Sequence, residues 1–213
     1  ADDETFGMGG TMLKARQQKI ETHLVVLTDG SKGGEGADLV EVRKNEVRQA
    51  ASLLGVKSLC TWSVSDRCLE VNDEIVYRAS SLIRDLSPAT VFFPGLLEIH
   101  PDHRATALLV WQALQKVSSR IDCPVPVSYE ISVQNPVNML IDITSLVEQK
   151  EKVMQVYVSQ NKENNYPELV LALDKGRTFS LPKEVKYAEG FFRYEKSDLD
   201  LCLEDITRQT IEL

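Results

Sequence analysis

The 213-residue sequence shows no pattern of a disulfide framework and no apolar run long enough for a membrane span. Its four cysteines form no CxxC pair, which disfavours a disulfide framework or an all-cysteine zinc site, so we expect reduced and mostly buried thiols. No apolar run approaches the roughly 18 residues of a membrane span, and no cationic segment followed by an apolar stretch opens the chain. The cytoplasm is therefore the expected location.

Basic residues are also in short supply. The 24 lysines and arginines are outnumbered by 32 acidic residues, and the resulting net charge of −8 disfavours a general attraction to nucleic acid or anionic lipid. Apolar residues make up 43% and charged residues 26%, which is an ordinary globular composition.

Because no repeat, low-complexity linker or composition break is present, we expect one domain over residues 1–213. Its oligomeric state stays open, a homo-oligomer included.

The order of apolar segments indicates the fold class. Short β-branched runs alternate with segments of helical spacing, which is typical of an α/β protein with a largely parallel sheet. Two prolines predict that segment 124–131 is an edge strand, because proline cannot donate to a ladder. Ser145 and Glu148 predict a capping box. Loops are expected at 159–165, which is polar, and at 33–36, which is glycine-rich and expected to be mobile. Strands are predicted at 24–27, 57–63, 91–93, 124–131 and 139–143, and helices at 6–20, about 39–54, 75–86, 105–117 and from Ser145 onward.

Two of the three histidines, His100 and His103, lie in one His-Pro-Asp-His tetrapeptide. The tetrapeptide follows the strand expected at 91–93 and precedes a helix, so it lies at the carboxyl end of a strand, where open α/β sheets bind ligands. A loop there can point an imidazole at a metal and use a nearby carboxylate to orient the other ring. In the alternative interpretation, Asp102 caps the helix and the histidines are solvated.

Three acidic residues, Asp2, Asp3 and Glu4, stand together at the start of the first expected helix. They are favourable there without any catalytic task, because the positive end of a helix dipole attracts carboxylates. Adjacent carboxylates can instead divide their roles, one ligating a cation while its neighbour takes a proton from water. One carboxylate and one imidazole would make a zinc site that still needs a third protein ligand.

Three glycines, Gly7, Gly9 and Gly10, stand inside the same expected helix, where each costs about 1 kcal/mol relative to alanine. We expect close packing of this helix against the sheet, or a close backbone approach to the site. A phosphate-binding interpretation is weak, because neither the P-loop pattern with its lysine nor the dinucleotide GxGxxG is present.

Together these motifs resemble the LmbE-like family of zinc-dependent de-N-acetylases, which includes the N-acetylglucosaminyl-phosphatidylinositol (PIG-L), mycothiol-pathway and bacillithiol-pathway deacetylases. The similarity runs in order from residue 1 to at least residue 160. It implies a Rossmann-like, three-layer α/β fold with a mainly parallel sheet. The stretches that carry it are Ala1-Asp2-Asp3-Glu4-Thr5-Phe6-Gly7-Met8-Gly9-Gly10-Thr11, Leu27-Thr28-Asp29-Gly30, Arg43 with Glu46, Leu54-Gly55-Val56, and His100-Pro101-Asp102-His103-Arg104-Ala105.

The resemblance implies roles for the residues that match the family's two catalytic motifs. Asp3 and His103 are the expected zinc ligands. Asp2 is the expected general base. His100, oriented by Asp102, is the expected proton donor or, when protonated, the electrostatic partner of the oxyanion.

The resemblance also implies a role for Arg43 and an expectation about what precedes Ala1. Arg43 matches an arginine that the family uses near the substrate or the leaving acetate, although a surface ion pair with Glu46 or Glu41 explains it equally well. The family's third zinc ligand, a histidine, and its first strand would precede Ala1. We therefore expect a fragment of a longer protein, in which the first strand is absent and two remaining protein ligands hold zinc poorly.

The function that the resemblance implies is zinc-dependent hydrolysis. The expected enzyme removes the acetyl group from an N-acetylglucosamine-type amino sugar or conjugate and releases acetate. Zinc would polarise the amide carbonyl and lower the pKa of its water toward about 7. The alternative is a non-catalytic carbohydrate-binding or interaction protein that retains the deacetylase fold. Hydrolysis of a different amide also stays open, as do the native metal and the aglycone.

Overall fold

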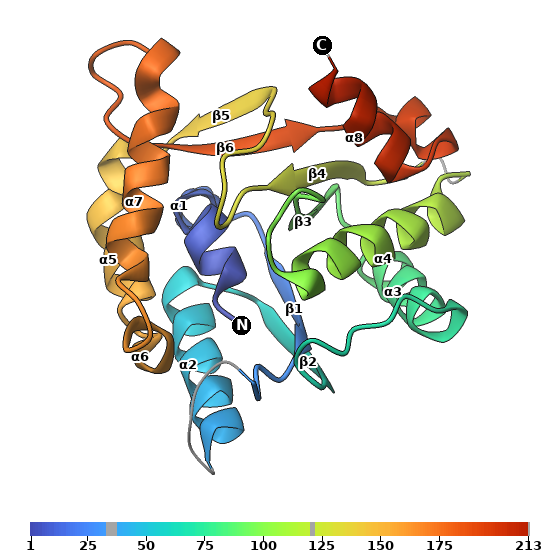
Figure 1. Ribbon diagram of the computed structural model, residues 1–213, viewed down its shortest axis with the longest axis horizontal. Coiled ribbons are helices and arrows are strands. Elements are labelled where there is room, and N and C mark those ends of the chain that lie inside the picture. Colours follow the sequence, from blue (N-terminus) through green and yellow to red (C-terminus); the bar gives the residue numbers. More distant parts are fainter. Residues whose placement is uncertain (33–37, 120–121, 213) are drawn as a thin grey trace. The chain divides into compact units, whose positions relative to one another are not determined.

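The computed structural model describes residues 1–32, 38–119 and 122–212 (Figure 1). The expected mobile loop at 33–36 lies outside the described residues. The chain divides into two compact units, the first formed by Ala1–Leu69 and Leu140–Gly190 and the second by Glu70–Met139 and Phe191–Leu213. The expectation of a single domain over 1–213 stays a prediction. None of the helices in the described ranges combines the length and apolar character needed to cross a bilayer.

The first unit is built on a pair of parallel strands, β1 (His23–Thr28) and β2 (Ser58–Val64), with Val25 opposite Cys60. The crossover between them contains α2 (Leu39–Leu54), which ends at Gly55 as predicted. Figure 1 shows α1 (Asp3–Gln17) packed beside α5 (Val147–Met154). The unit is completed by α6 (Val158–Asn161), α7 (Tyr166–Gly176) and the 3-10 segments Thr144–Leu146 and Arg177–Ser180.

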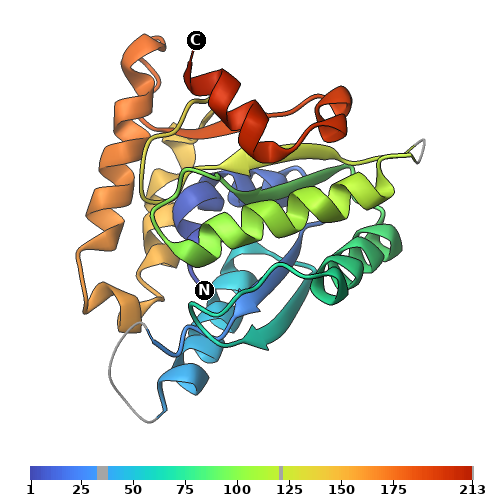
Figure 2. The same ribbon diagram turned by 45° about the vertical axis from the view of Figure 1, so that its right-hand side comes forward.

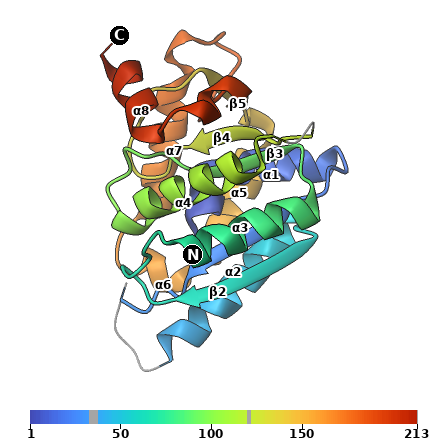
Figure 3. The same ribbon diagram turned by 90° about the vertical axis from the view of Figure 1, so that its right-hand side faces the viewer.

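The second unit also contains a parallel pair, β3 (Thr90–Pro94) and β4 (Val125–Tyr129). Its helix α4 (Pro101–Val117) lies along these strands (Figure 2), and α3 (Asp73–Leu86) lies beside α4 (Figure 3). The C-terminal segment adds the 3-10 helix Lys196–Asp200 and α8 (Leu203–Ile211). An apolar cluster joins β3, α4 and the C-terminal segment, with Phe93, Trp111, Tyr194 and Leu203 among its buried members.

The expectation that segment 124–131 is an edge strand was wrong. β4 pairs on both sides, parallel to β3 and antiparallel to the end of β6 (Ala188–Arg193), which is itself hydrogen-bonded to β5 (Met139–Asp142). Pro126 lies opposite Val91, and its carbonyl accepts a hydrogen bond from Tyr194 N at 3.0 Å. The strand therefore keeps a partner there although the proline nitrogen cannot donate.

Three smaller expectations also need correction. Thr144–Leu146 forms a 3-10 turn and Leu146 is the N-cap of α5, so the predicted Ser145–Glu148 capping box does not form in the described structure. The polar segment 159–165 is not wholly loop, because α6 takes up its first residues. The four cysteines are free thiols, as expected, but Cys68 and Cys202 are exposed and the other two are only partly buried.

The close packing predicted for the glycines of α1 is found at Gly10. A Cβ atom on Gly10 would lie 2.6 Å from Ile143 Cγ2, so only glycine fits there without a shift of the neighbour. The helix is interrupted at Met8, whose φ of −146° is not helical. Beyond this kink, the buried Glu189 carboxylate accepts the backbone N–H groups of Gly10 and Thr11, each at 2.7 Å. Glu189 of β6 thus caps the second half of α1.

The α/β class is confirmed, because each unit combines helices with a parallel strand pair.

Candidate active site

The acidic triplet lies where α1 begins, within the first unit. Asp2 is the N-cap, and its φ of 90° places a non-glycine residue in the left-handed region. Such a conformation is uncommon and costs free energy, and strained residues of this kind cluster at functional sites. Its carbonyl accepts the N–H of Phe6 at 2.9 Å, and its side chain is buried. Asp3 and Glu4 form the first turn of the helix, as predicted.

Burial raises the pKa of the Asp2 carboxyl well above its ordinary value. The charges of Asp3 and Glu4 add to this shift, and the charge of Arg43 opposes it. A carboxylate whose pKa is raised by burial binds a proton more strongly than an exposed one. The environment of Asp2 is therefore that of a proton acceptor.

Glu4, the third residue of the acidic triplet, makes a contact that the sequence did not predict. Its Oε1 accepts hydrogen bonds from the Tyr157 hydroxyl and from Thr5 Oγ1, each at 2.9 Å. Both Glu4 and Tyr157 are buried, and burial raises the pKa of the Glu4 carboxyl. The Glu4–Tyr157 contact joins the first turn of α1 to the segment between α5 and α6. It thereby restricts the orientation of the helix start that carries Asp2 and Asp3. No spacing in the sequence links positions 4 and 157.

Arg43 is buried on α2 with 4% of its surface exposed, so the alternative of a surface ion pair was wrong. Glu41 instead contacts the exposed Arg48 at 3.4 Å. The Arg43 guanidinium donates to the Gly30 carbonyl at 2.5 Å, and Gly30 has a φ of 65°. A side chain on Gly30 would collide with this guanidinium. Arg43 also lines a cavity of about 290 Å³ within the first unit, together with Ala1, Val26, Thr28, Asp29, Lys44, Val47, Thr61 and Ser63.

The His-Pro-Asp-His tetrapeptide opens α4 in the second unit, six residues after β3. His100, and not Asp102 as in the alternative interpretation, is the N-cap, and its Nδ1 accepts the backbone N–H of Asp102 at 3.2 Å. A backbone N–H can only donate, so Nδ1 must offer its lone pair and the proton of the neutral ring lies on Nε2. This contact between the two residues is made by the Asp102 backbone. The Asp102 side chain is buried in the first turn.

His103 follows one turn later, with its ring centroid 5.0 Å from that of His100. Its side chain is 13% exposed, and its Nδ1 lies 3.7 Å from Oε2 of Glu98, which is fully buried. Burial alone would raise the pKa of Glu98, but contacts from His103, Ser132 and Ile131 outweigh it and hold this pKa below its ordinary value. The Glu98 carboxylate is therefore charged at neutral pH and faces one nitrogen of His103.

Glu98 was missed by sequence reasoning. The only signal is an acidic residue inside the otherwise apolar stretch Gly95-Leu96-Leu97-Glu98-Ile99, two positions before His100. An acid in such a stretch is costly to bury unless it has partners. That signal alone does not show which histidine the carboxylate faces.

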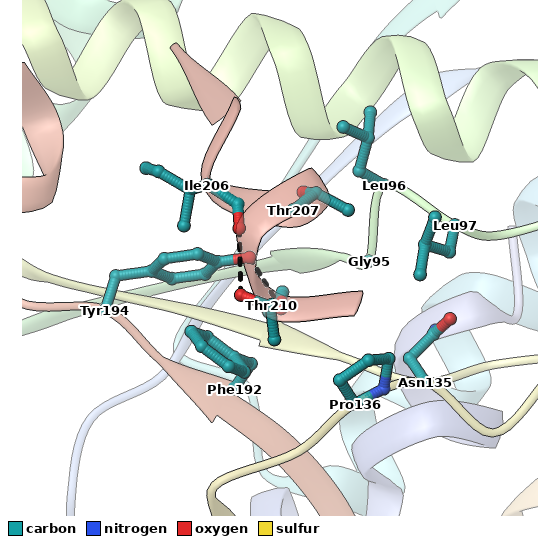
Figure 4. Close-up of a pocket in the computed structure, with 11 residues that line it drawn as sticks. Gly95, Leu96, Leu97, Asn135, Pro136, Phe192, Tyr194, Ile206, Thr207 and Thr210 are labelled. Carbon is teal, nitrogen blue, oxygen red and sulfur yellow. Dashed lines mark hydrogen bonds between the residues drawn. The ribbon is translucent and has the colours of Figure 1, made fainter. Parts of the chain in front are cut away.

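The second unit contains a pocket with about 340 Å³ of empty volume, which is lined in part by the three residues that precede Glu98. Leu96 and Leu97 lie on one side of it and Phe192 and Tyr194 on the other (Figure 4). Its walls combine these apolar side chains with the polar Ser128, Asn135, Thr207 and Thr210. The remaining lining residues are Gly95, Pro136 and Ile206.

The structure therefore gathers the predicted residues in two groups. Asp2, Asp3 and Arg43 belong to the first unit, and His100, Asp102 and His103 belong to the second. The third histidine, His23, is partly buried at the start of β1 and contacts Ser58 Oγ through Nδ1 at 2.6 Å.

Comparisons with known proteins agree on one relationship. The family model described as PIG-L, GlcNAc-PI de-N-acetylase, matches residues 1–114. A probable N-acetyl-alpha-D-glucosaminyl L-malate deacetylase 2 of Bacillus anthracis is 27% identical over 178 residues, 75% of this chain and 77% of its own. The structure of N,N'-diacetylchitobiose deacetylase from Pyrococcus horikoshii, complexed with its inhibitor MPG, has a TM-score of 0.83 at 25% identity and covers 96% of this chain and 85% of its own.

A second solved structure shows that this fold is not tied to one reaction. GalB, the 4-carboxy-2-hydroxymuconate hydratase from Pseudomonas putida KT2440, has a TM-score of 0.79 at 20% identity and covers 91% of this chain and 92% of its own. A likeness of that kind concerns the fold alone. The reaction of this protein must therefore be argued from its side chains and from the family match.

Proposed function

Because the chain belongs to the GlcNAc-PI de-N-acetylase (PIG-L) family, we propose that it is a zinc-dependent hydrolase that removes the acetyl group from an N-acetylglucosamine-type amino sugar and releases acetate. The observation that carries the proposal is that the matched segment, residues 1–114, contains both the acidic triplet and the His-Pro-Asp-His tetrapeptide. A Rossmann-like, three-layer arrangement with a mainly parallel sheet is part of the same proposal.

The donor types of the two proposed ligands fit zinc, although catalytic zinc sites usually take three protein ligands and a water. Asp3 offers carboxylate oxygens from the first turn of α1, and His103 offers an imidazole whose Nδ1 faces Glu98, leaving Nε2 for a metal. Carboxylate oxygen and imidazole nitrogen are both common zinc ligands. When bound, zinc supplies Lewis acidity that polarises the amide carbonyl and makes water a better nucleophile at neutral pH.

Asp2 is the proposed general base. Its raised pKa makes it a stronger proton acceptor than an exposed aspartate, and it works only in the ionised form. It takes the proton of the attacking water while a C–O bond forms at the acetyl carbon. The same proton is then available for the amine, which must be protonated to leave as the C–N bond breaks.

His100 is the proposed hydrogen-bond donor to the oxyanion or to the leaving nitrogen. The contact from Asp102 N to Nδ1 favours the neutral ring with its proton on Nε2, which corresponds to the proton donor among the two roles that the resemblance implies. A neutral imidazole can donate this bond without the cost of a buried cation. Loss of one such donor typically lowers the rate on the order of a hundredfold or more.

The substrate class is proposed from the relatives. One is named for an N-acetylglucosaminyl malate and another for diacetylchitobiose, and both names contain an N-acetylated glucosamine. Arg43, buried and held against the Gly30 carbonyl, is the proposed contact for the substrate or for the released acetate. A guanidinium fixed in this way can bind a carboxylate with two hydrogen bonds.

Acetate release from N-acetylglucosamine conjugates, measured with and without a metal chelator, tests the proposal. We expect acetate and a free amine in equal amounts, and loss of both when the chelator is present. Binding of the sugar without any acetate release would instead favour a non-catalytic carbohydrate-binding protein. Release of a different acyl group in preference to acetate would point to hydrolysis of another amide.

A further inference from the structure

We propose that Glu98 is a positioning residue that holds His103 with its proton on Nδ1, and that His100 and His103 are thereby kept in opposite tautomers. His100 then presents an Nε2–H donor, and His103 presents an Nε2 lone pair. The part of this inference that concerns metal binding rests on the proposed function, because it takes His103 as a zinc ligand.

The Glu98 carboxylate is buried and held from the loop that follows β4. Oε1 accepts the backbone N–H of Ile131 at 2.8 Å and contacts Asn135 Nδ2 at 3.3 Å. Oε2 accepts the backbone N–H of Ser132 at 3.1 Å and its hydroxyl at 2.5 Å. Donors therefore fix both oxygens, and only 1% of the residue is exposed. A carboxylate held in this way cannot turn away from the ring that it faces.

The ring that Oε2 faces is that of His103, at 3.7 Å from Nδ1. This distance is longer than a hydrogen bond but is within the range of an ion pair. An ionised carboxylate is only an acceptor, so a lone pair on Nδ1 would be repelled and a proton there is attracted. A neutral imidazole carries one proton, and with it on Nδ1 the lone pair is left on Nε2.

The neighbouring His100 has the opposite environment. Its Nδ1 accepts a backbone N–H from Asp102, so the proton of its neutral ring is on Nε2. The two rings, 5.0 Å apart between centroids, thus differ in what Nε2 can do. Metal-ligating histidines commonly give their other N–H to a carboxylate, which fixes the tautomer and raises the basicity of the ligating nitrogen.

Nitrogen-15 NMR of the imidazole rings tests the assignment directly in chelator-treated protein, at a pH where both rings are neutral. We expect His103 to be protonated at Nδ1 and His100 at Nε2. Finding His103 protonated at Nε2 in the unmodified protein would overturn the proposal without any variant.

Two variants then separate positioning from packing. Glu98→Gln removes the charge and is expected to shift His103 toward the Nε2–H tautomer and to weaken zinc binding, measured by chelator competition, by about 10- to 100-fold. Ser132→Ala, the control, removes one donor to Glu98 and is expected to leave the tautomer unchanged and zinc affinity within about twofold. An unchanged His103 tautomer in Glu98→Gln would contradict the proposal.

The outcomes also separate this inference from the proposed function. If unmodified protein shows the expected tautomers but binds no zinc and releases no acetate, the proposed function fails and the role of Glu98 in fixing the ring stands. If acetate release is zinc-dependent but His103 carries its proton on Nε2, the proposed function stands and the role of Glu98 fails.

Discussion

His100 Nδ1 accepts the backbone N–H of Asp102 at 3.2 Å, so a histidine serves as the N-cap of α4. This one contact closes the first turn of the helix and also determines which nitrogen of the ring can donate a proton. The N-cap of α4 and the proposed Nε2–H donor are therefore the same His100 side chain. Substitutions of His100 can be chosen that keep the cap and remove the donor.

His100→Asn should separate the cap from the donor. Asparagine is a good N-cap, so this variant should unfold at nearly the same free energy as the unmodified protein, whereas His100→Ala should lose about 1 kcal/mol. Both variants should lose about a hundredfold in kcat, because both lack the Nε2–H donor. Urea unfolding and acetate-release assays measure the two effects. Full activity in His100→Asn would show that the histidine serves only as a cap.

Asp2→Asn should retain metal and lose turnover. The substitution keeps the size of the side chain and removes the ionised form that accepts a proton, so kcat should fall by about 10²- to 10⁴-fold. Zinc content by atomic emission and acetate release give the two readouts. Normal deacetylation by this variant would rule out Asp2 as the base.

His103→Ala should instead lose zinc, because it removes a proposed ligand. The matched control is His23→Ala, at the start of β1, which removes a contact with Ser58 and should leave zinc content unchanged. Equilibrium dialysis against zinc with both variants makes the comparison. Equal zinc retention by both would show that His103 is not a ligand.

Gly10→Ala should destabilise the first unit more than Gly9→Ala. The new Cβ at position 10 meets Ile143 at 2.6 Å, whereas at position 9 it meets the Lys150 side chain at 3.4 Å. We expect a loss of about 1–3 kcal/mol from overpacking at position 10. At position 9 the higher helix propensity of alanine should offset most of any cost. Chemical denaturation of the two variants decides whether close packing explains these glycines.

Lys150 should contribute stability that is lost only at high pH. It is fully buried, with Nζ 2.7 Å from Asp174 and 2.8 Å from Glu189. Burial alone would lower its pKa, but the two carboxylates outweigh burial and raise it above its ordinary value. A raised folded-state pKa means that this stability is fully present below the unfolded pKa of about 10.4 and declines as pH rises through the folded value.

Lys150→Met tests this directly. Leaving two carboxylates without the lysine should cost about 3–5 kcal/mol at neutral pH. The free energy of unfolding of the variant should also fall less steeply with pH above about 10.4 than that of the unmodified protein. Parallel slopes for the two proteins in that range would show that folding does not raise the pKa of Lys150.

Apolar spacing and stop signals are local properties, so the sequence predicted part of the fold: segment 39–54 matches α2. The helix expected from 105 instead begins at Pro101, so three residues of the tetrapeptide lie in its first turn. The elements β6, α7 and α8 were not predicted. The prediction for β4 was wrong because whether a strand is covered depends on β6, more than sixty residues away. The pairing of β4 with such a distant strand cannot be read from the residues of β4 itself.

The site was predicted only in part, again because contacts between distant segments are not visible in local sequence patterns. The motifs named Asp2, Asp3, His100 and His103, but the residues that hold them could not be read from spacing. Glu4 depends on Tyr157, from a distant segment, as its partner. The capping role of His100 was also hidden, because asparagine, aspartate and serine are the usual caps and Asp102 stood close by.

The most direct test of the account is acetate release from diacetylchitobiose or N-acetylglucosaminyl malate by chelator-treated protein, followed by addition of excess zinc. We expect no acetate before the addition, restored release after it, and no restoration in Asp2→Asn. Release that continues unchanged in chelator, or an Asp2→Asn variant as active as the unmodified protein, would contradict the proposed zinc-dependent deacetylation.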